Sequence, residues 1–146
     1  YQKILYTHLS KSTNDDIKAI ALKSIKEVDY HFKHSRAWLL RLGGGTEESK
    51  VKIQDSIDEL WRFTGEMFES DDVEKNLTSE NLITASNTYY DEWSKTVKVT
   101  LEEALLTEPE NVVMLSGGKK GLHTEKLGFM LAEMQYLPRT YPNAKW

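Results

Sequence analysis

Residues 15–42 read DDIKAIALKSIKEVDYHFKHSRAWLLRL, and this stretch decides the fold. Apolar and small side chains recur along it at intervals of three and four, the spacing of one face of an α-helix. They are Ile17, Ile20, Ala21, Ser24, Val28, Phe32, Ser35, Leu39 and Leu42. A helix of this length would extend about 40 Å, which suits a helical bundle better than a small mixed domain.

Helical segments are predicted on both sides of this stretch. Residues 1–9 have helical spacing with no capping residue before them, and Asn14 or Asp15 can cap the long helix. We expect the long helix to end at Gly43-Gly44-Gly45, where glycine can adopt the left-handed conformation that ends helices. Thr46 then caps a third helix that continues to residue 68.

The second half of the chain is also predicted to be helical. Residues 69–84 are polar and predict a loop with a turn of helix, and a fourth helix runs from Thr84 or Ser86 to Glu108-Pro109. A last helix covers residues 124–137 and is broken by Pro138. No alternating pattern predicts a sheet, so the chain is expected to be all-α and to form a single domain, 1–146.

The apolar face of residues 15–42 and two further sets of apolar residues are expected to build the core. Those of the third helix are Ile53, Ile57, Leu60, Trp61, Thr64, Met67 and Phe68, and those of the fourth are Tyr89, Trp93, Val97, Leu101, Ala104 and Leu105. Trp38, Trp61, Trp93 and Trp146 are expected in the core or at an interface.

Composition excludes several classes of function. The net charge is −4 and the basic residues are dispersed, which argues against nucleic-acid binding. The chain contains no cysteine, so disulfides, thiolate zinc sites and cysteine nucleophiles are excluded. No apolar run approaches the ~20 residues of a membrane span, and we expect a cytoplasmic protein.

The strongest candidate for a metal-binding site is a carboxylate with two imidazoles on the long helix. Glu27 and His31 are four residues apart and His34 follows three later, so they share one flank. Diiron bundles use Glu-x-x-His on two helices and a further glutamate from each of two others. The sequence contains no Glu-x-x-His. We therefore favour a charge-assisted hydrogen bond to a neighbouring helix over a metal site.

Two further candidates lie near the C-terminus. His123 and Glu125 could be ligands, but their place before and within the first turn of a helix favours capping. Lys119 and Lys120, in Gly117-Gly118-Lys119-Lys120-Gly121, could contact an anion or an acidic partner. The sequence lacks the residue order Gly-x-x-x-x-Gly-Lys-Ser/Thr of a phosphate-binding loop. A solvated turn is therefore the simpler interpretation.

Specific motifs resemble one family. They are KEVDYH at 26–31, SRAWLLRLGGGT at 35–46, LWRFT at 60–64, GGKKGLHTEKLG at 117–128 and MLAEMQYL at 130–137. These stretches resemble the PaaC-type subunit of the bacterial phenylacetyl-CoA ring epoxidase, a multicomponent oxygenase of aerobic phenylacetate degradation. The resemblance covers essentially the whole chain and is looser over residues 69–110.

The resemblance implies a ferritin-like helical bundle and a non-catalytic role. Subunits of this type support a catalytic A subunit, which binds two irons and epoxidises the aromatic ring of phenylacetyl-CoA, in a heteromeric complex. Glu27, His31, His123 and Glu125 would then be vestigial ligand positions, with no cofactor bound by this chain. Family members are longer, with further N-terminal bundle helices, so the chain resembles their C-terminal portion. We expect it to pair with a second copy or with the remaining part of such a bundle.

Two other functions remain open. One is a diiron or dimanganese oxidase whose remaining ligands lie in a missing N-terminal half, which would need Glu27, His31 and Glu125 to converge on one point. The other is a helical interaction module unrelated to oxygenases.

Overall fold

The computed structural model describes residues 1–145, and Trp146 lies outside the described residues. The chain divides into two compact units, Tyr1–Leu115 and the segment from Ser116 onward. Over residues 1–145 the regular elements are all helical and no strand occurs, which confirms the all-α prediction and is consistent with a ferritin-like bundle. None of the helices in that range is both long and apolar enough to cross a membrane.

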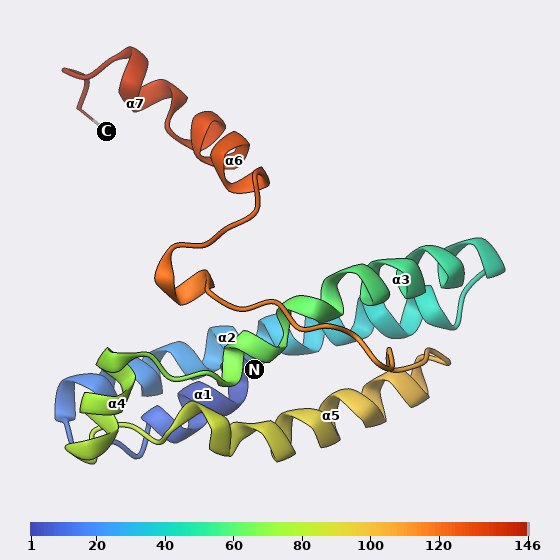
Figure 1. Ribbon diagram of the computed structural model, residues 1–146, viewed down its shortest axis with the longest axis horizontal. Coiled ribbons are helices and arrows are strands. Elements are labelled where there is room, and N and C mark those ends of the chain that lie inside the picture. Colours follow the sequence, from blue (N-terminus) through green and yellow to red (C-terminus); the bar gives the residue numbers. More distant parts are fainter. Residues whose placement is uncertain (146) are drawn as a thin grey trace. The chain divides into compact units, whose positions relative to one another are not determined.

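The first unit is built from five α-helices and three 3-10 turns. They are α1 (Gln2–Leu9), α2 (Asp15–Gly43), α3 (Glu47–Leu60), η1 (Trp61–Phe63), η2 (Gly65–Phe68), α4 (Asp72–Ser79), η3 (Ser86–Tyr89) and α5 (Tyr90–Glu103). Helix α2 is the longest, at 29 residues, or about 44 Å. It packs on α1, α3 and α5, so it forms the spine of this unit (Figure 1).

Side-chain caps start α2 and α3 where the sequence predicts them. In contrast, α5 begins at Tyr90 without a side-chain cap, after a 3-10 turn, rather than at the predicted Thr84 or Ser86. The N–H of Ile17 donates to Asn14 Oδ1 at 3.0 Å at the start of α2. The N–H of Ser49 donates to Thr46 Oγ1 at 3.2 Å at the start of α3. Helix α1 has no side-chain cap, as expected from its first residues. Local capping chemistry therefore places the starts of α2 and α3 correctly, because it depends on residues next to each other in sequence.

The glycines after α2 end it for a different reason from the predicted one. Gly44 has φ −89°, and the left-handed glycines of residues 1–145 are elsewhere. Gly43 is instead needed for close packing: a Cβ there would lie 2.1 Å from the carbonyl oxygen of Ala104, just after α5. Ala104 is fully buried. The glycine thus allows the end of α2 to approach the end of α5.

Helix α5 ends at Glu103, well before Pro109 and earlier than predicted. Leu105 adopts φ 58°, the N–H of Leu106 donates to Leu101 O at 2.9 Å, and the N–H of Leu105 donates to Glu102 O at 3.1 Å. This is the Schellman arrangement, which reverses the chain and is usually accompanied by an apolar contact. Leu101 and Leu106 supply that contact, since both are buried in the same cluster.

Two linked apolar clusters form the core of the first unit. One contains Ile4, Tyr89 and Trp93, and the other contains Leu101, Ala104 and Leu106. Trp61 and Val97 pack against both. Tyr89 is 1% exposed and its hydroxyl donates to Thr84 O at 2.9 Å, so its polar atom is satisfied inside the core.

Several predicted core positions are wrong. Ile20, Leu60 and Leu105 are 62%, 60% and 64% exposed. Trp38, expected in the core or at an interface, is 48% exposed and so lies outside the core of this unit. Ile20 and Trp38 lie on the side of α2 that faces away from Ala21 and Val28, its buried residues. Helical periodicity identifies an apolar face but does not say which part of it a neighbour covers.

Two segments differ from their predicted form. Within residues 69–84, α4 makes an eight-residue helix capped by Asp71, whose Oδ1 accepts from the N–H of Glu74 at 2.8 Å. The third helix becomes 3-10 after Leu60. In both places short-range capping and turn bonds outweigh the composition used for the prediction.

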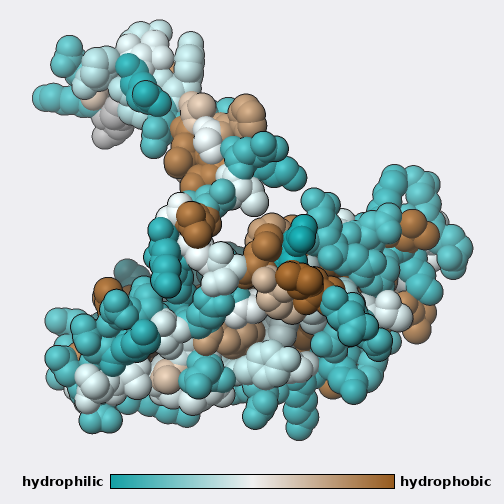
Figure 2. All heavy atoms as spheres, in the orientation of Figure 1, coloured by the Kyte–Doolittle hydropathy of each residue, from teal (hydrophilic) through white to brown (hydrophobic). Residues whose placement is uncertain are grey.

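The second unit contains η4 (Gly118–Lys120), α6 (Lys126–Met134) and α7 (Tyr136–Thr140). The predicted helix 124–137 is therefore two helices, and Pro138 lies within α7 rather than after it. Pro138 is tolerated there because it occupies the first turn, where a backbone N–H has no partner in the helix. Apolar side chains gather over α6 on the face shown in Figure 2, and Phe129, Met130 and Met134 are exposed.

Substitutions at Leu105 test our explanation of why α5 ends at Glu103. We expect Leu105→Gly to raise the free energy of unfolding by about 0.5–1 kcal/mol, because glycine adopts positive φ without the Cβ clash. Urea denaturation measures this change. Leu105→Ala, which removes the exposed side chain but keeps the Cβ, should give no such gain, and an equal gain from alanine would refute the explanation.

Candidate functional site

The central turns of α2 carry the charged network of this region. Asp29 accepts from Lys3 Nζ at 2.8 Å through Oδ1 and contacts Lys33 Nζ at 2.6 Å through Oδ2. Lys3 also lies 5.0 Å from the centre of the Phe32 ring. Because Lys3 belongs to α1 and Lys33 to α2, Asp29 links the two helices. Hydrogen bonds from Lys3 and Lys33 lower the pKa of Asp29 from 3.8 to about 2.

Glu27 and His31 take no part in that network. Both side chains are exposed. The hydrogen bond to a neighbouring helix that we favoured for them is made by Asp29 instead. Asp29 can reach α1 because it lies nearer the packed side of α2, whereas Glu27 lies on the outer side.

The described residues gather no set of candidate metal ligands within either unit. Among residues 1–145, no group of three or more histidine, aspartate or glutamate side chains is arranged to hold a metal ion. Glu27 and His31 are in the first unit, and His123 and Glu125 are in the second. Each pair is exposed and forms no such group.

His123 and Glu125 do not act as side-chain caps. Glu125 occupies the N-cap position of α6, but its side chain makes no capping hydrogen bond. The helix start is held by the backbone, where the N–H of Leu127 donates to Thr124 O and that of Gly128 to Glu125 O, each at 3.1 Å. Glu125 therefore precedes the first turn of α6 rather than lying within it, and the predicted side-chain cap is absent.

Lys119 and Lys120 lie on a tight turn between two left-handed glycines. Gly117 has φ 108° and Gly121 has φ 83°, and the N–H of Leu122 donates to Gly117 O at 3.0 Å. Both lysines are exposed. Only glycine adopts these φ values without strain, so the Gly-Gly-Lys-Lys-Gly motif has a structural explanation in the turn.

An aromatic stripe on the outer side of α2 was missed from the sequence. Tyr30 and His34 stack with centroids 6.0 Å apart, His34 meets Trp38 edge-on at 6.4 Å, and Arg41 lies 5.5 Å from the Trp38 ring centre. We name these four residues the outer stripe. Their spacing of four, four and three was visible in the sequence and is the signal that could have found them.

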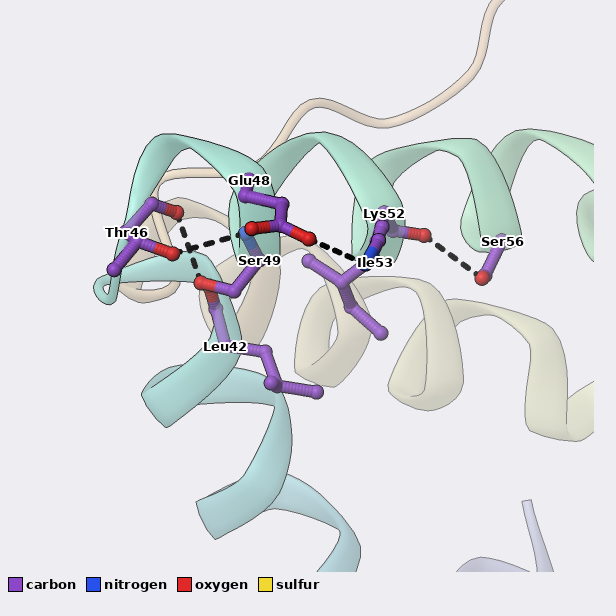
Figure 3. A pocket seen from close by; sticks show the side chains of 7 residues that line it. All are labelled: Leu42, Thr46, Glu48, Ser49, Lys52, Ile53 and Ser56. Atoms are coloured by element: carbon purple, nitrogen blue, oxygen red, sulfur yellow. Dashed lines mark hydrogen bonds and ion pairs between the residues drawn. The ribbon is translucent and has the colours of Figure 1, made fainter.

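Polar side chains that line the hollow beside the α2–α3 turn are engaged in hydrogen bonds or ion pairs. The hollow encloses about 400 Å³ and is lined by residues of the turn and of α3 (Figure 3). Ser49 Oγ donates to Leu42 O at 2.8 Å, and Lys52 pairs with Glu48 at 2.6 Å. Ser49 holds the turn and the Lys52–Glu48 pair lies within α3, so we assign this hollow a structural role.

A second hollow is almost entirely apolar. It measures about 280 Å³ and lies between α2, α3 and α5, where Leu39, Ile57, Trp93 and Leu101 line it. Its lining provides no acid, base or nucleophile apart from the hydroxyls of Ser56 and Thr64. This hollow can pack against apolar groups but cannot carry out acid–base chemistry.

Comparison with known proteins identifies relatives. A family model described as phenylacetic acid catabolic protein matches residues 1–146. The C subunit of 1,2-phenylacetyl-CoA epoxidase from Escherichia coli (strain K12) is 45% identical over 142 residues, which is 97% of this chain and 57% of that protein. The chain thus spans a little over half the length of this curated relative.

The pKa of Asp29 predicts a pH-dependent contribution to stability. Its folded pKa of about 2 lies below its ordinary value of 3.8, so the stabilisation is present above about pH 4 and is lost as the pH falls toward 2. We expect wild type to melt at a higher temperature than Asp29→Asn near neutral pH, with the difference disappearing between pH 4 and pH 2. The effect should be small because the pair is solvent-exposed.

Thermal melts at a series of pH values measure this difference. Asp55→Asn, a substitution of an exposed acid on α3, serves as the control and should show no such pH dependence. A difference between wild type and Asp29→Asn that stayed constant down to pH 2 would contradict the assignment.

Proposed function

The chain belongs to the phenylacetic acid catabolic protein family, and from this membership we propose that it is a non-catalytic subunit of a phenylacetyl-CoA epoxidase complex. The similarity to the C subunit of that epoxidase over nearly the whole chain is the observation that carries the proposal. In this role it supports a catalytic A subunit that holds the diiron centre and epoxidises the substrate ring. We expect this subunit to be located in the cytoplasm.

The arrangement of α2 supports a structural role. A metal-binding helix needs several carboxylates and imidazoles aimed at one point. In α2 the inner acid, Asp29, is neutralised by Lys3 and Lys33, and His34 stacks on Tyr30 and meets Trp38 edge-on. Asp29 therefore helps to hold helices together and His34 forms part of an aromatic surface, whereas Glu27 and His31 remain exposed.

Rigidity is what this chain would contribute to a complex. Asp29 ties α1 to α2, and Arg36 of α2 pairs with Glu103 of α5. Trp61 packs on both core clusters. A scaffold held in this way presents a fixed surface to the catalytic subunit, and we include a second copy of the chain among its partners.

The alternative is a diiron or dimanganese oxidase that completes its ligand set with residues outside this chain. Glu27 and His31 favour it to the extent that both are exposed on one flank of α2 and available to bind. If the chain were such an oxidase, catalysis would require Glu27 and His31. A structural subunit would not require them for catalysis.

A reconstituted complex separates the two functions. We expect the double substitution Glu27→Gln and His31→Gln, made in this chain and copurified with a phenylacetate-pathway A subunit, to leave iron content and epoxidation of phenylacetyl-CoA within about twofold of wild type. Loss of metal ligands would instead lower both by about 10–100-fold or more. Elemental analysis and product formation provide the two measurements.

Controls make the outcome decisive. Glu59→Gln, on the exposed side of α3, is the matched substitution and should behave as wild type. This chain alone, purified after iron loading, should contain well under one iron per chain. Failure of the wild-type chain to copurify with the A subunit would refute the proposed role and favour a helical module unrelated to oxygenases.

A further inference from the structure

We propose that residues 107–115, which we name the strap, store slack chain behind a latch and can lengthen the tether to the second unit without unfolding the first. The strap follows the turn that ends α5 and runs back beside α3 to the last residue of the first unit (Figure 1). It has a firm attachment at its start, a weak one at its end, and more chain between them than the path requires. This device is additional to the proposed function and does not depend on it.

The firm attachment, which we name the anchor, joins Thr107 to the side chain of Gln54 on α3. The N–H of Thr107 donates to Gln54 Oε1 at 2.9 Å, and Gln54 Nε2 donates to Thr107 O at 3.0 Å. Gln54 Nε2 also donates to Asp58 Oδ1 at 2.8 Å, which orients the amide group. Leu106, directly before Thr107, is 6% exposed and belongs to a core cluster. Several hydrogen bonds and a buried neighbour therefore hold the start of the strap.

The weak attachment, which we name the latch, joins the last two residues of the strap to the 3-10 turns after α3. The N–H of Leu115 donates to Arg62 O at 2.8 Å. Met114 packs on Gly65, where an added Cβ would lie 3.1 Å from Met114 Cγ. Met114 and Leu115 are 45% and 38% exposed. Because one hydrogen bond and one flexible, half-exposed side chain hold this end, it should open more readily than the anchor.

The strap is longer than the path between its attachments. Gln54 and Arg62 are eight positions apart along α3 and η1, which corresponds to about 13 Å. Thr107 and Leu115 are also eight positions apart, but an extended chain of that length spans about 26 Å. About 13 Å of chain is therefore stored between the anchor and the latch. Asn111 adopts φ 56° at a bend within the strap, where the chain departs from an extended path.

Opening of the latch would release the stored chain toward the second unit. The anchor and the buried Leu106 would stay in place, so the core clusters of the first unit would keep their packing. The distance from Thr107 to Leu115 could then increase by about 13 Å. Tether length sets the effective concentration at which a linked unit meets its binding surface. The latch is thus a device that regulates association through the second unit.

Hydrogen exchange of two backbone amides tests the difference between the attachments, because each attachment contains one of them. In the wild-type chain, exchange corrected for intrinsic rates should be at least about tenfold slower at Thr107 than at Leu115. Met114→Ala should accelerate exchange at Leu115 by about threefold to tenfold and leave Thr107 within about twofold. Gln54→Ala should accelerate exchange at Thr107 and leave Leu115 within about twofold. NMR spectroscopy measures both rates in each variant.

A matched control lies in the same strap. Val113 is 77% exposed, so Val113→Ala removes an apolar side chain next to Met114 without removing a contact of the latch. Exchange at Thr107 and at Leu115 should be the same in this variant as in the wild-type chain.

Spin labels measure the stored chain. The sequence has no cysteine, so Glu59→Cys on α3 and Lys120→Cys in the second unit can be labelled specifically, and double electron–electron resonance gives the distribution of distances between them. The double substitution Met114→Ala and Leu115→Pro removes both contacts of the latch, and it should extend the long-distance limit by up to about 13 Å. Removal of residues 110–111 from that variant takes away about 7 Å of chain, so it should cancel about half of the extension.

Each result supports or overturns the proposal. Separate responses of the two amides, with an extension that shrinks after the deletion, support it. Equal exchange at Thr107 and Leu115, a joint response of both amides to either substitution, an unchanged distance distribution without the latch, or an extension that ignores the deletion overturns it. None of these measurements uses the A subunit, so failure of the latch is distinguished from failure of the proposed function.

Discussion

The packing of Trp61 against Trp93 is the contact on which the first unit depends. Their ring centroids are 5.8 Å apart, and Trp61 touches both core clusters while Trp93 is nearly buried in one of them. The contact joins the end of α3 to the start of α5. Gly43 provides the matching constraint at the other end of α5, because only a residue without a Cβ can approach the Ala104 carbonyl so closely. Between these two points the position of α5 against α2 and α3 is determined.

The position of α2 then divides its surface into two chemically different sides. Ion pairs to α1 and α5, through Asp29 and Arg36, occupy one side together with the buried Ala21 and Val28. The opposite side retains Tyr30, His34 and Trp38 in contact with one another and exposed. One helix thus both stabilises its own unit and keeps an aromatic surface exposed. This combination suits a protein whose proposed role is to support a catalytic neighbour.

The comparison with relatives and the geometry of α2 bear on different parts of the proposed function. Family membership supplies the biochemical context, phenylacetate catabolism. The side chains of α2 supply an argument for a structural role, since Asp29 is held by two lysines, one of them on α1. The paired lysines also lower its pKa, so Asp29 is charged and engaged over the physiological range. Its ion pair with Lys3 joins α1 to α2.

The sequence by itself determined the all-α class, the family, the starts of α2 and α3 and the length of the long helix. These features depend on local capping, periodicity and motifs, which neighbouring residues determine. Only the tertiary structure decided that Asp29 rather than Glu27 or His31 bonds to α1, that Trp38 is exposed, that Gly43 serves close packing and that α5 ends at Glu103. Each of these depends on which residues of distant segments meet. A helical pattern cannot encode such contacts, because every position on an apolar stripe looks equally able to be covered until its neighbour is in place.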